Sequence, residues 1–298
     1  MGASPEFQED PLRGRVQTVR WFRATPEALQ PSEPDLLKVT DRGYQYGEGL
    51  FETLRTCSRR PVLLDAHLRR LSESARFLGI PLPSDLSAIP EALEQMLPDE
   101  DITIKIILSR GGAGRYAELD SHSLLSLQIF PYRPPEDEHY REGVTLHTVA
   151  AHRSATSPLH RHKTLNYLDS IMARREARSH DAYEALIINT DDFIAECSMS
   201  NIFFVLDGVV LTPTVESNVL RGITRDAILR LCRENDIPHD ERLMNFADIL
   251  FAQEVFITNS LIGVMPVREI DGKAFGNECP GPVTTRLSVL YNEKILAR

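Results

Sequence analysis

Short hydrophobic stretches bounded by glycine, proline or acidic residues recur along the whole chain, and this pattern predicts many strands. The pair Asp207-Gly208 sits between two of these stretches and is typical of a two-residue hairpin turn. In the first half, the expected strands lie at residues 16–21, 36–39, 50–56, 102–108 and 124–130. In the second half, they lie at residues 144–150, 185–189, 194–197, 202–206, 209–211 and 255–258.

Between these stretches, hydrophobic residues recur at a helical spacing. The first predicted helix begins after Asp65, which is the expected N-cap, and it ends at Gly79. Because successive strands follow one another in hairpins, we expect an α+β fold with largely antiparallel sheets. Further helices are expected at residues 86–97, 166–178, 222–234 and 283–296.

A segment rich in proline and acidic residues divides the chain. Residues 131–138 contain Pro131, Pro134 and Pro135 together with three acidic side chains, a composition that interrupts helices and strands. We therefore place a linker at residues 134–140, between a small N-terminal domain at 16–133 and a large domain at 141–298. Residues 1–15 are polar and turn-rich, and we treat them as an N-terminal extension of open origin, native or from cloning.

The overall composition disfavours several classes of function. The formal net charge of −10 disfavours binding to nucleic acid or to an anionic membrane. No hydrophobic run approaches the roughly 20 residues that span a bilayer, and no secretion signal opens the chain. The cysteines are scattered, without the paired spacing of a metal or redox site. We therefore expect a cytoplasmic protein that holds no metal.

A few polar residues stand in positions that suit chemistry. Lysine is rare, and Lys163 lies between a polar loop and an amphipathic helix. Glu196 lies in an otherwise hydrophobic strand, where a buried carboxylate needs a partner, although a salt bridge on the sheet face explains it equally well. The segment Gly222-Ile223-Thr224 opens a helix, either as a plain N-cap or as an anion site. The segment Thr258-Asn259-Ser260 is likewise a turn or an anion cradle.

Five motifs occur in one order along the chain. They are YQYGEGLFETLR at 44–55, HLRRL at 67–71, KTLNYL at 163–168, ECSMSNIF at 196–203 and GITR at 222–225. In this order and spacing, the segment from Asp41 to Val267 resembles the class IV aminotransferase family. The resemblance implies a fold type IV enzyme that depends on pyridoxal 5'-phosphate (PLP), with two α/β domains joined by a short linker.

The resemblance also implies roles for individual residues. Lys163 would hold PLP as a Schiff base and carry the Cα proton of the substrate. Glu196 would keep the pyridine nitrogen protonated, Tyr167 would hydrogen-bond near the ring oxygen, and Asn201 would support a loop. The enzyme would be a homodimer, in which residues 44–49 and 110–115 approach the partner's site. The phosphate would lie against Arg70, Ile223, Thr224 and Ser260.

Three branches of the family share this apparatus and differ in how they hold the substrate. Branched-chain transaminases usually carry Tyr-x-Arg where this chain has Thr103-Ile104-Lys105. D-amino-acid transaminases usually carry Arg-x-His where this chain has Arg110-Gly111-Gly112, and a tyrosine in place of Phe51. The 4-amino-4-deoxychorismate lyases resemble this chain better, in the segments 51–55, 105–115 and 258–260.

The leading interpretation is therefore a lyase that converts 4-amino-4-deoxychorismate to 4-aminobenzoate and pyruvate. Strand alternation puts Lys105 on one face with Thr103 and Ile107, so Lys105 can point into the site. Basic side chains suit this substrate because it has two carboxylates. The alternatives are an amino-acid transaminase of branched-chain or D-amino-acid type with a 2-oxo acid acceptor, and a PLP-binding protein without activity. The expected substrate contacts are Phe51, Lys105, Arg110, Arg115, Asn259 and Leu261.

Overall fold

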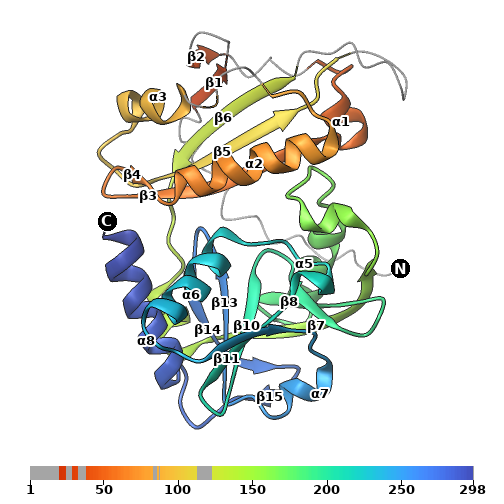
Figure 1. The fold of residues 1–298 in the computed structure, drawn as a ribbon, viewed down its shortest axis with the longest axis vertical. Helices are drawn as coiled ribbons and strands as arrows, with labels where there is room; N and C mark the ends of the chain where they lie inside the picture. The colour runs from red at the N-terminus through yellow and green to blue at the C-terminus, as the bar shows by residue number, and fades with distance from the viewer. Residues whose placement is uncertain are drawn as a thin grey trace, which may run out of the picture.

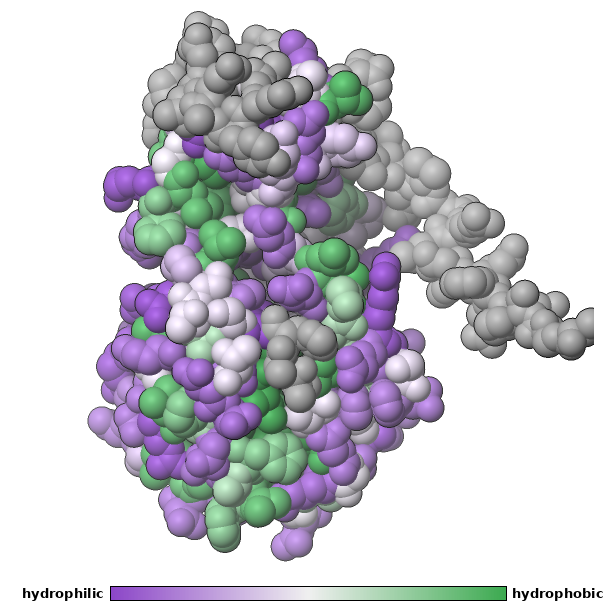
Figure 2. Space-filling model, turned by 90° about the vertical axis from the view of Figure 1, so that its right-hand side faces the viewer, coloured by the Kyte–Doolittle hydropathy of each residue, from purple (hydrophilic) through white to green (hydrophobic). Residues whose placement is uncertain are grey.

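The chain folds into two sheets, each with its own helices (Figure 1). The first sheet lies in the upper half of the view and the second in the lower half. On the face shown in Figure 2, the described surface is mostly hydrophilic and narrows between the two halves. Within the described part of the chain, no helix is both long and apolar enough to cross a membrane. The structure is a computed structural model that describes residues 20–24, 29–32, 38–82, 86, 88–112 and 123–297.

The first sheet is antiparallel throughout. Its strand order is β2-β1-β6-β5-β3-β4, and each neighbouring pair runs in opposite directions. Three helices accompany it, namely α1 (Arg42–Tyr46), α2 (Leu64–Leu78) and α3 (Ala88–Met96). The strands are β1 (Arg20–Ala24), β2 (Leu29–Ser32), β3 (Gly49–Cys57), β4 (Arg60–Pro61), β5 (Ile102–Ser109) and β6 (Leu124–Pro131).

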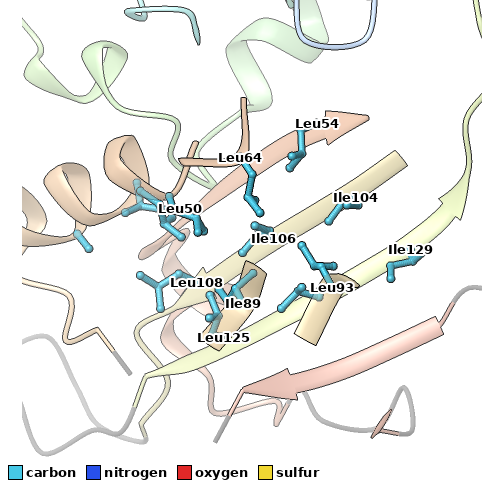
Figure 3. Packing of buried hydrophobic residues seen from close by; sticks show 14 of the residues in the cluster. Leu50, Leu54, Leu64, Ile89, Leu93, Ile104, Ile106, Leu108, Leu125 and Ile129 are labelled. Atoms are coloured by element: carbon cyan, nitrogen blue, oxygen red, sulfur yellow. The ribbon is translucent and has the colours of Figure 1, made fainter. Parts of the chain in front are cut away.

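Alternation along β3 and β5 gives the first sheet one core face. Leu54 and Ile104 belong to a buried hydrophobic cluster to which α2 and α3 also contribute. Figure 3 shows Ile89 and Leu93 of α3 pointing toward the strands of this cluster. Burying each such side chain contributes about 1.5–3 kcal/mol. The intervening residues of both strands are therefore directed to the opposite face, where they are available to a site.

The second sheet is mixed. Its strand order is β12-β11-β10-β13-β14-β7-β8-β9, with β15 paired to β14. The neighbours β11 and β12, β14 and β7, and β7 and β8 run parallel, and the other pairs run antiparallel. The strands are β7 (Val144–Arg153), β8 (Glu184–Asn189), β9 (Ile194–Cys197), β10 (Asn201–Leu206), β11 (Val209–Pro213), β12 (His239–Arg242), β13 (Glu254–Asn259), β14 (Gly263–Ile270) and β15 (Lys273–Ala274).

Helices cover this second sheet and connect its strands. The longer ones are α5 (Leu168–Ser179), α6 (Ile223–Glu234) and α8 (Pro282–Tyr291), and α7 (Phe246–Ile249) is a single turn. The hairpin predicted at Asp207-Gly208 joins β10 to β11, and both turn residues have a positive φ. The α+β class and the mainly antiparallel pairing are therefore confirmed, with the two parallel pairs at β7 and the parallel pair of β11 with β12 as the exceptions.

Several element boundaries differ from their predictions. Helix α2 begins at Leu64 after Leu63, whose backbone is left-handed, so Asp65 lies in the first turn and does not cap the helix. Asp65 still suits that place because the first turn of a helix favours an acidic side chain. The expected strand at 36–39 is absent from its described residues, 38 and 39, which lie at a turn. Residues 1–19 lie outside the described residues.

The predicted linker holds a short helix. The first sheet ends at Pro131 and the second begins at Val144, and α4 (Asp137–Glu142) lies between them. Asp137 and Glu138 occupy the first turn of α4, so the acidic residues that argued against regular structure favour a helix start there. We propose that the division into a small and a large domain falls in this connection.

Candidate active site

Residues from both halves of the molecule line one cavity of about 630 Å³. Its walls come from β3 and β5, from the segment 163–167, from the β9–β10 turn, from the start of α6 and from the end of β13. Of the predicted site residues that the structure describes, all except Arg110 lie in this wall. They are Phe51, Arg70, Lys105, Lys163, Tyr167, Glu196, Ile223, Thr224, Asn259, Ser260 and Leu261.

The segment that carries Lys163 is tied to β3 by backbone hydrogen bonds. The Phe51 N–H donates to the Lys163 carbonyl at 2.9 Å, and the Leu165 N–H donates to the Gly49 carbonyl at 2.9 Å. A Cβ on Gly49 would lie 2.7 Å from the backbone oxygen of Leu108 as well as 2.5 Å from Cδ1 of Leu165, so this close approach requires glycine. Two motifs that are far apart in the sequence therefore fit together here and hold Lys163 at the cavity wall.

The amine of Lys163 lies among aromatic groups. Its Nζ is 4.3 Å from the centroid of the Phe51 ring and donates a 3.5 Å hydrogen bond to the Tyr167 hydroxyl. Burial, reinforced by the positive charge of Arg70, lowers the pKa of Lys163 to about 8. A much larger share of the amine is therefore neutral near pH 7 than for an ordinary lysine. A neutral amine is what both nucleophilic attack and proton removal require.

Glu196 projects into the cavity from β9 and is held by three neighbours. Arg153, at the end of β7, forms a salt bridge with it. The Asn201 side-chain amide donates to Oε2 of Glu196 at 2.9 Å, and the Leu220 N–H donates to the same carboxylate at 3.2 Å. The predicted need for a buried partner is thus met by Arg153, which the sequence analysis did not identify. No local pattern links residues 43 positions apart.

One end of the cavity offers unused hydrogen-bond donors. Helix α6 begins there after Gly222. As a glycine, this residue has no side chain that could accept a hydrogen bond from the N–H groups of the first turn. A Cβ on Gly222 would lie 1.9 Å from Oδ1 of Asn201, so glycine is required there. The hydroxyls of Thr224 and Thr258 are buried and make no well-formed hydrogen bond within the described residues, although Tyr291 lies beside Thr224. Helix N–H groups and hydroxyls suit a phosphate.

Arg70 lies near this end but is already paired with a buried carboxylate. Its Nε and Nη2 donate to Glu52 at 2.8 and 2.6 Å, and its Nη1 donates to the Arg221 carbonyl at 2.9 Å. Burial alone would raise the pKa of Glu52, but the charge and hydrogen bonds of Arg70, together with those of His67, outweigh burial and lower the pKa to about 2. Each terminal nitrogen of Arg70 keeps an N–H group for an anion. Glu52 therefore orients this guanidinium, a role that the sequence analysis missed.

His67 extends the same network to the other half of the molecule. Its Nδ1 lies 2.7 Å from Oε2 of Glu52, and its Nε2 lies 3.2 Å from the Ser260 hydroxyl. Burial lowers the pKa of His67 even though Glu52 opposes the shift. A neutral imidazole that donates to Glu52 through Nδ1 accepts from Ser260 through Nε2. Glu52 and His67 thus link helix α2 to the loop that carries Ser260.

Strands β3 and β5 of the first sheet form another part of the cavity wall. Thr53 of β3 pairs with Lys105 of β5, and both side chains line the cavity, which agrees with the predicted alternation. Nζ of Lys105 lies 5.3 Å from the centroid of the Phe51 ring, the same ring that Lys163 contacts. Burial lowers the pKa of Lys105. Two amines therefore lie near one aromatic ring.

The loop after β13 closes another side of the cavity. Oδ1 of Asn259 accepts from the N–H groups of Leu261 and Ile262 at 2.9 and 3.0 Å, so Asn259 shapes the loop from within. The Tyr132 hydroxyl donates to the Leu261 carbonyl at 2.6 Å, and the Tyr140 hydroxyl donates to the Ile262 carbonyl at 2.9 Å. The connection between the two sheets thus fixes a loop of the site.

One predicted substrate contact that the structure describes, Arg110, does not line this cavity. Arg110 is buried elsewhere, where its Nη1 donates to the Gly79 carbonyl at 2.8 Å and lies 3.2 Å from Glu48. Its charge is thus used to hold the end of α2 within its own chain. Arg115 lies outside the described residues. Two charged residues that were not predicted also line the cavity. They are Arg174 and the buried Glu184, whose side chains lie 3.3 Å apart.

Comparison with known proteins agrees with this fold and site. The sequence model described as Amino-transferase class IV matches residues 49–270. D-alanine aminotransferase from Bacillus licheniformis is 31% identical over 264 residues, which cover 87% of this chain and 92% of that protein. The structure of 4-amino-4-deoxychorismate lyase from Pseudomonas aeruginosa matches with a TM-score of 0.78 and 30% identity, over 89% of this chain and 97% of that one.

A further match is the branched-chain amino acid aminotransferase from Escherichia coli, with a TM-score of 0.83 and 26% identity over 93% of this chain and 94% of that one. The fold and the cavity define a fold type IV enzyme that uses PLP. The chain belongs to the class IV aminotransferase family. The cavity fits this cofactor, because it brings together a lysine, a paired carboxylate and unused donors at a helix start.

Proposed function

We propose that the enzyme is a 4-amino-4-deoxychorismate lyase, which forms 4-aminobenzoate and pyruvate. The observation that supports this proposal is the position of Lys105, which lines the cavity and has its amine over the same Phe51 ring as Lys163. The substrate has a carboxylate on its ring and another on its enolpyruvyl group. A second cation beside the reacting amine suits such a substrate, because it can hold one carboxylate while the amine stays at Lys163.

The residues of the cavity have different roles in this reaction. When bound, PLP supplies an electron-withdrawing ring that makes the C–H bond next to the substrate amine acidic. Lys163 takes that proton on Nζ, and Glu196, with Arg153 behind it, supplies a fixed negative charge at the cavity wall. The C–O bond to the neighbouring carbon then breaks, and the ring becomes aromatic. Lys163 returns its proton to the departing group, which leaves as pyruvate.

Lys105 and Phe51 orient the substrate for this step. The Lys105 ammonium holds a carboxylate by charge, and its partly buried place strengthens the attraction. Phe51 lines the cavity beside both lysines and offers the substrate ring an aromatic contact. This arrangement keeps the C–H bond within reach of Lys163 and leaves the protein little further chemistry to supply, because aromatisation favours the elimination.

An amino-acid transaminase is the second candidate, and a specific feature favours it. Part of the cavity wall is hydrophobic, which suits the side chain of an apolar amino acid. The D-alanine and branched-chain aminotransferases among the similar proteins support the same reaction class. The hydrophobic residues of this wall are Leu165, Ile171, Met199, Leu261 and Ile262.

One preparation of the enzyme decides between the two reactions. In the first assay, a coupled synthase supplies 4-amino-4-deoxychorismate and 4-aminobenzoate is detected. In the second, L- and D-amino acids are offered with 2-oxoglutarate. We expect product in the first assay and its loss in Lys163→Ala, with a raised KM in Lys105→Met. Rapid amino transfer without any 4-aminobenzoate would refute the lyase assignment and establish the transaminase.

We further propose that the enzyme acts as a homodimer in the cytoplasm. Tyr44 and Tyr46 of α1 are 65% and 41% exposed, which is unusual for aromatic side chains and supports an interface there. The loop that begins at Arg110 lies next to α1, since the Arg42 N–H donates to the Gly111 carbonyl. Sedimentation and activity measured at one concentration test this proposal, and a fully active monomer would contradict it.

A further inference from the structure

A second cavity of about 600 Å³ lies beside the active site, between helix α2 and helix α6. Arginine side chains dominate its rim. Arg69 stands on α2, Arg230 and Arg233 stand on α6, and Arg161 and Arg221 come from the loops next to Lys163 and before α6. We call this cavity the arginine groove. It draws positive charge from both halves of the molecule.

The charge of the arginine groove is not balanced by its own acidic residues. Glu73 and Asp226 are the acidic residues in its lining, and Asp226 lies 3.2 Å from Arg221. Among the described residues, no acidic side chain lies within salt-bridge distance of Arg69, Arg161 or Arg233. On a chain with a net charge of −10, such a groove concentrates anions locally.

The floor of the groove is hydrophobic. Leu63 and Ala66 on one side and Val219, Ile223 and Ala227 on the other contribute to it. A cavity of this size with a hydrophobic floor and convergent polar groups is typical of a site for a small organic molecule. The guanidinium groups at its rim match the oxygens of a phosphate in pairs. The groove therefore selects for a ring or other flat body that carries a phosphate.

The groove and the active site share a wall. Arg70 and Ile223 line both cavities, and the Arg70 guanidinium also donates to the carbonyl of Arg221 at the rim of the groove. His162 lines the groove directly before Lys163, and its Nδ1 lies 2.9 Å from the Ser74 hydroxyl. A ligand in the groove would thus contact groups that hold the phosphate end of the active site.

We propose that the arginine groove is a second ligand site, which binds a phosphorylated ring compound of the class to which PLP itself belongs. The groove has no lysine in its lining, so the ligand is held by charge and packing without a covalent bond. Arg70 and Ile223 lie between the two sites. A ligand bound in the groove therefore affects the residues that contact the phosphate end of the cofactor. This inference does not depend on which reaction the enzyme catalyses.

The test uses the holoenzyme with its cofactor fixed on Lys163 by borohydride reduction. Pyridoxine 5'-phosphate, an alcohol that cannot form a Schiff base, is titrated in by calorimetry. We expect one additional molecule bound per chain, with affinity that falls as salt rises. The double variant Arg69→Ala/Arg233→Ala should weaken binding by about tenfold or more. Arg141→Ala, an exposed arginine on α4 away from the groove, should leave binding unchanged.

Each alternative result overturns the proposal. Absence of binding at millimolar probe would show that the groove is not a site for this class of ligand. Equal binding by the double variant would place the probe elsewhere. Equal binding of unphosphorylated pyridoxine would show that the groove does not recognise the phosphate. The double variant should keep the colour of the bound cofactor before reduction, because Arg69 and Arg233 are exposed and lie outside the active-site cavity. This colour verifies that the variant folds.

Discussion

Replacement of Glu52 by glutamine should reveal how strongly the buried network around Arg70 contributes to stability. Glu52 is 1% exposed and accepts hydrogen bonds from Arg70, with His67 beside it. Its pKa falls from 4.5 to about 2. At 1.36 kcal/mol per unit, this shift corresponds to about 3 kcal/mol of stability near neutral pH. Removal of one partner from a buried ion pair costs a similar amount, about 3–5 kcal/mol.

The pH dependence follows from the direction of the shift. A carboxylate whose pKa is lower in the folded state stabilises the protein above its unfolded pKa, and this contribution is lost as pH falls through about 4.5 toward 2. At pH 4, the free-energy gap between wild type and Glu52→Gln should therefore be smaller than at pH 7 by roughly 1 kcal/mol.

The assay is urea unfolding of the apo-enzyme at both pH values, because bound cofactor would add its own stabilisation. Glu234→Gln serves as the control, since Glu234 is 52% exposed and lies 3.8 Å from Arg230 on the same helix. That variant should lie within about 0.5 kcal/mol of wild type at both pH values. A loss below about 1 kcal/mol for Glu52→Gln at pH 7, or a difference in unfolding free energy from wild type that widens at pH 4, would show that Glu52 does not stabilise the fold through its ion pair.

Three further predictions follow from the same contacts. Arg153→Met should cost about 3–5 kcal/mol of unfolding free energy by leaving Glu196 without its cation, and adding Glu196→Gln should recover part of it, whereas additive losses would speak against the pair. Tyr132→Phe and Tyr140→Phe should each raise KM several-fold with little change in kcat, at about 1 kcal/mol per hydrogen bond, and unchanged KM in both would show that the loop holds its shape alone. The rate at which the apo-enzyme attaches PLP should rise with pH and level off above about 8, since the Lys163 amine must be neutral to attack, and a rise that continues toward 10.5 would show an ordinary lysine.

Features that depend on a local pattern could be predicted from the sequence. Alternation along β5 put Lys105 on the face opposite the core, and it lines the cavity. Gly79 ends α2 with the left-handed backbone that glycine favours. The fold class and the PLP chemistry followed from motifs whose residues converge on one cavity, although far apart in the chain. These features could be predicted because each depends on residues that are neighbours in the sequence or on a complete motif.

Features that depend on pairing across the fold could not be predicted in this way. The motifs contain Glu52 and His67 but do not indicate their roles. Their hydrogen bonds join β3, α2 and the loop of Ser260, which are far apart in the sequence. Arg153 is one arginine among many until β7 places it beside Glu196. Arg110 is a different case. It matched a family position for a substrate contact, but in this structure its guanidinium binds the Gly79 carbonyl and Glu48.

We propose Lys163 as the residue that holds the cofactor. Reduction of the holoenzyme with borohydride, followed by peptide mapping, reads this directly. We expect the pyridoxyl label on the peptide that contains Lys163, whose amine lies in the cavity with its pKa lowered to about 8. A label on Lys105, the other lysine in the cavity wall, would contradict the account.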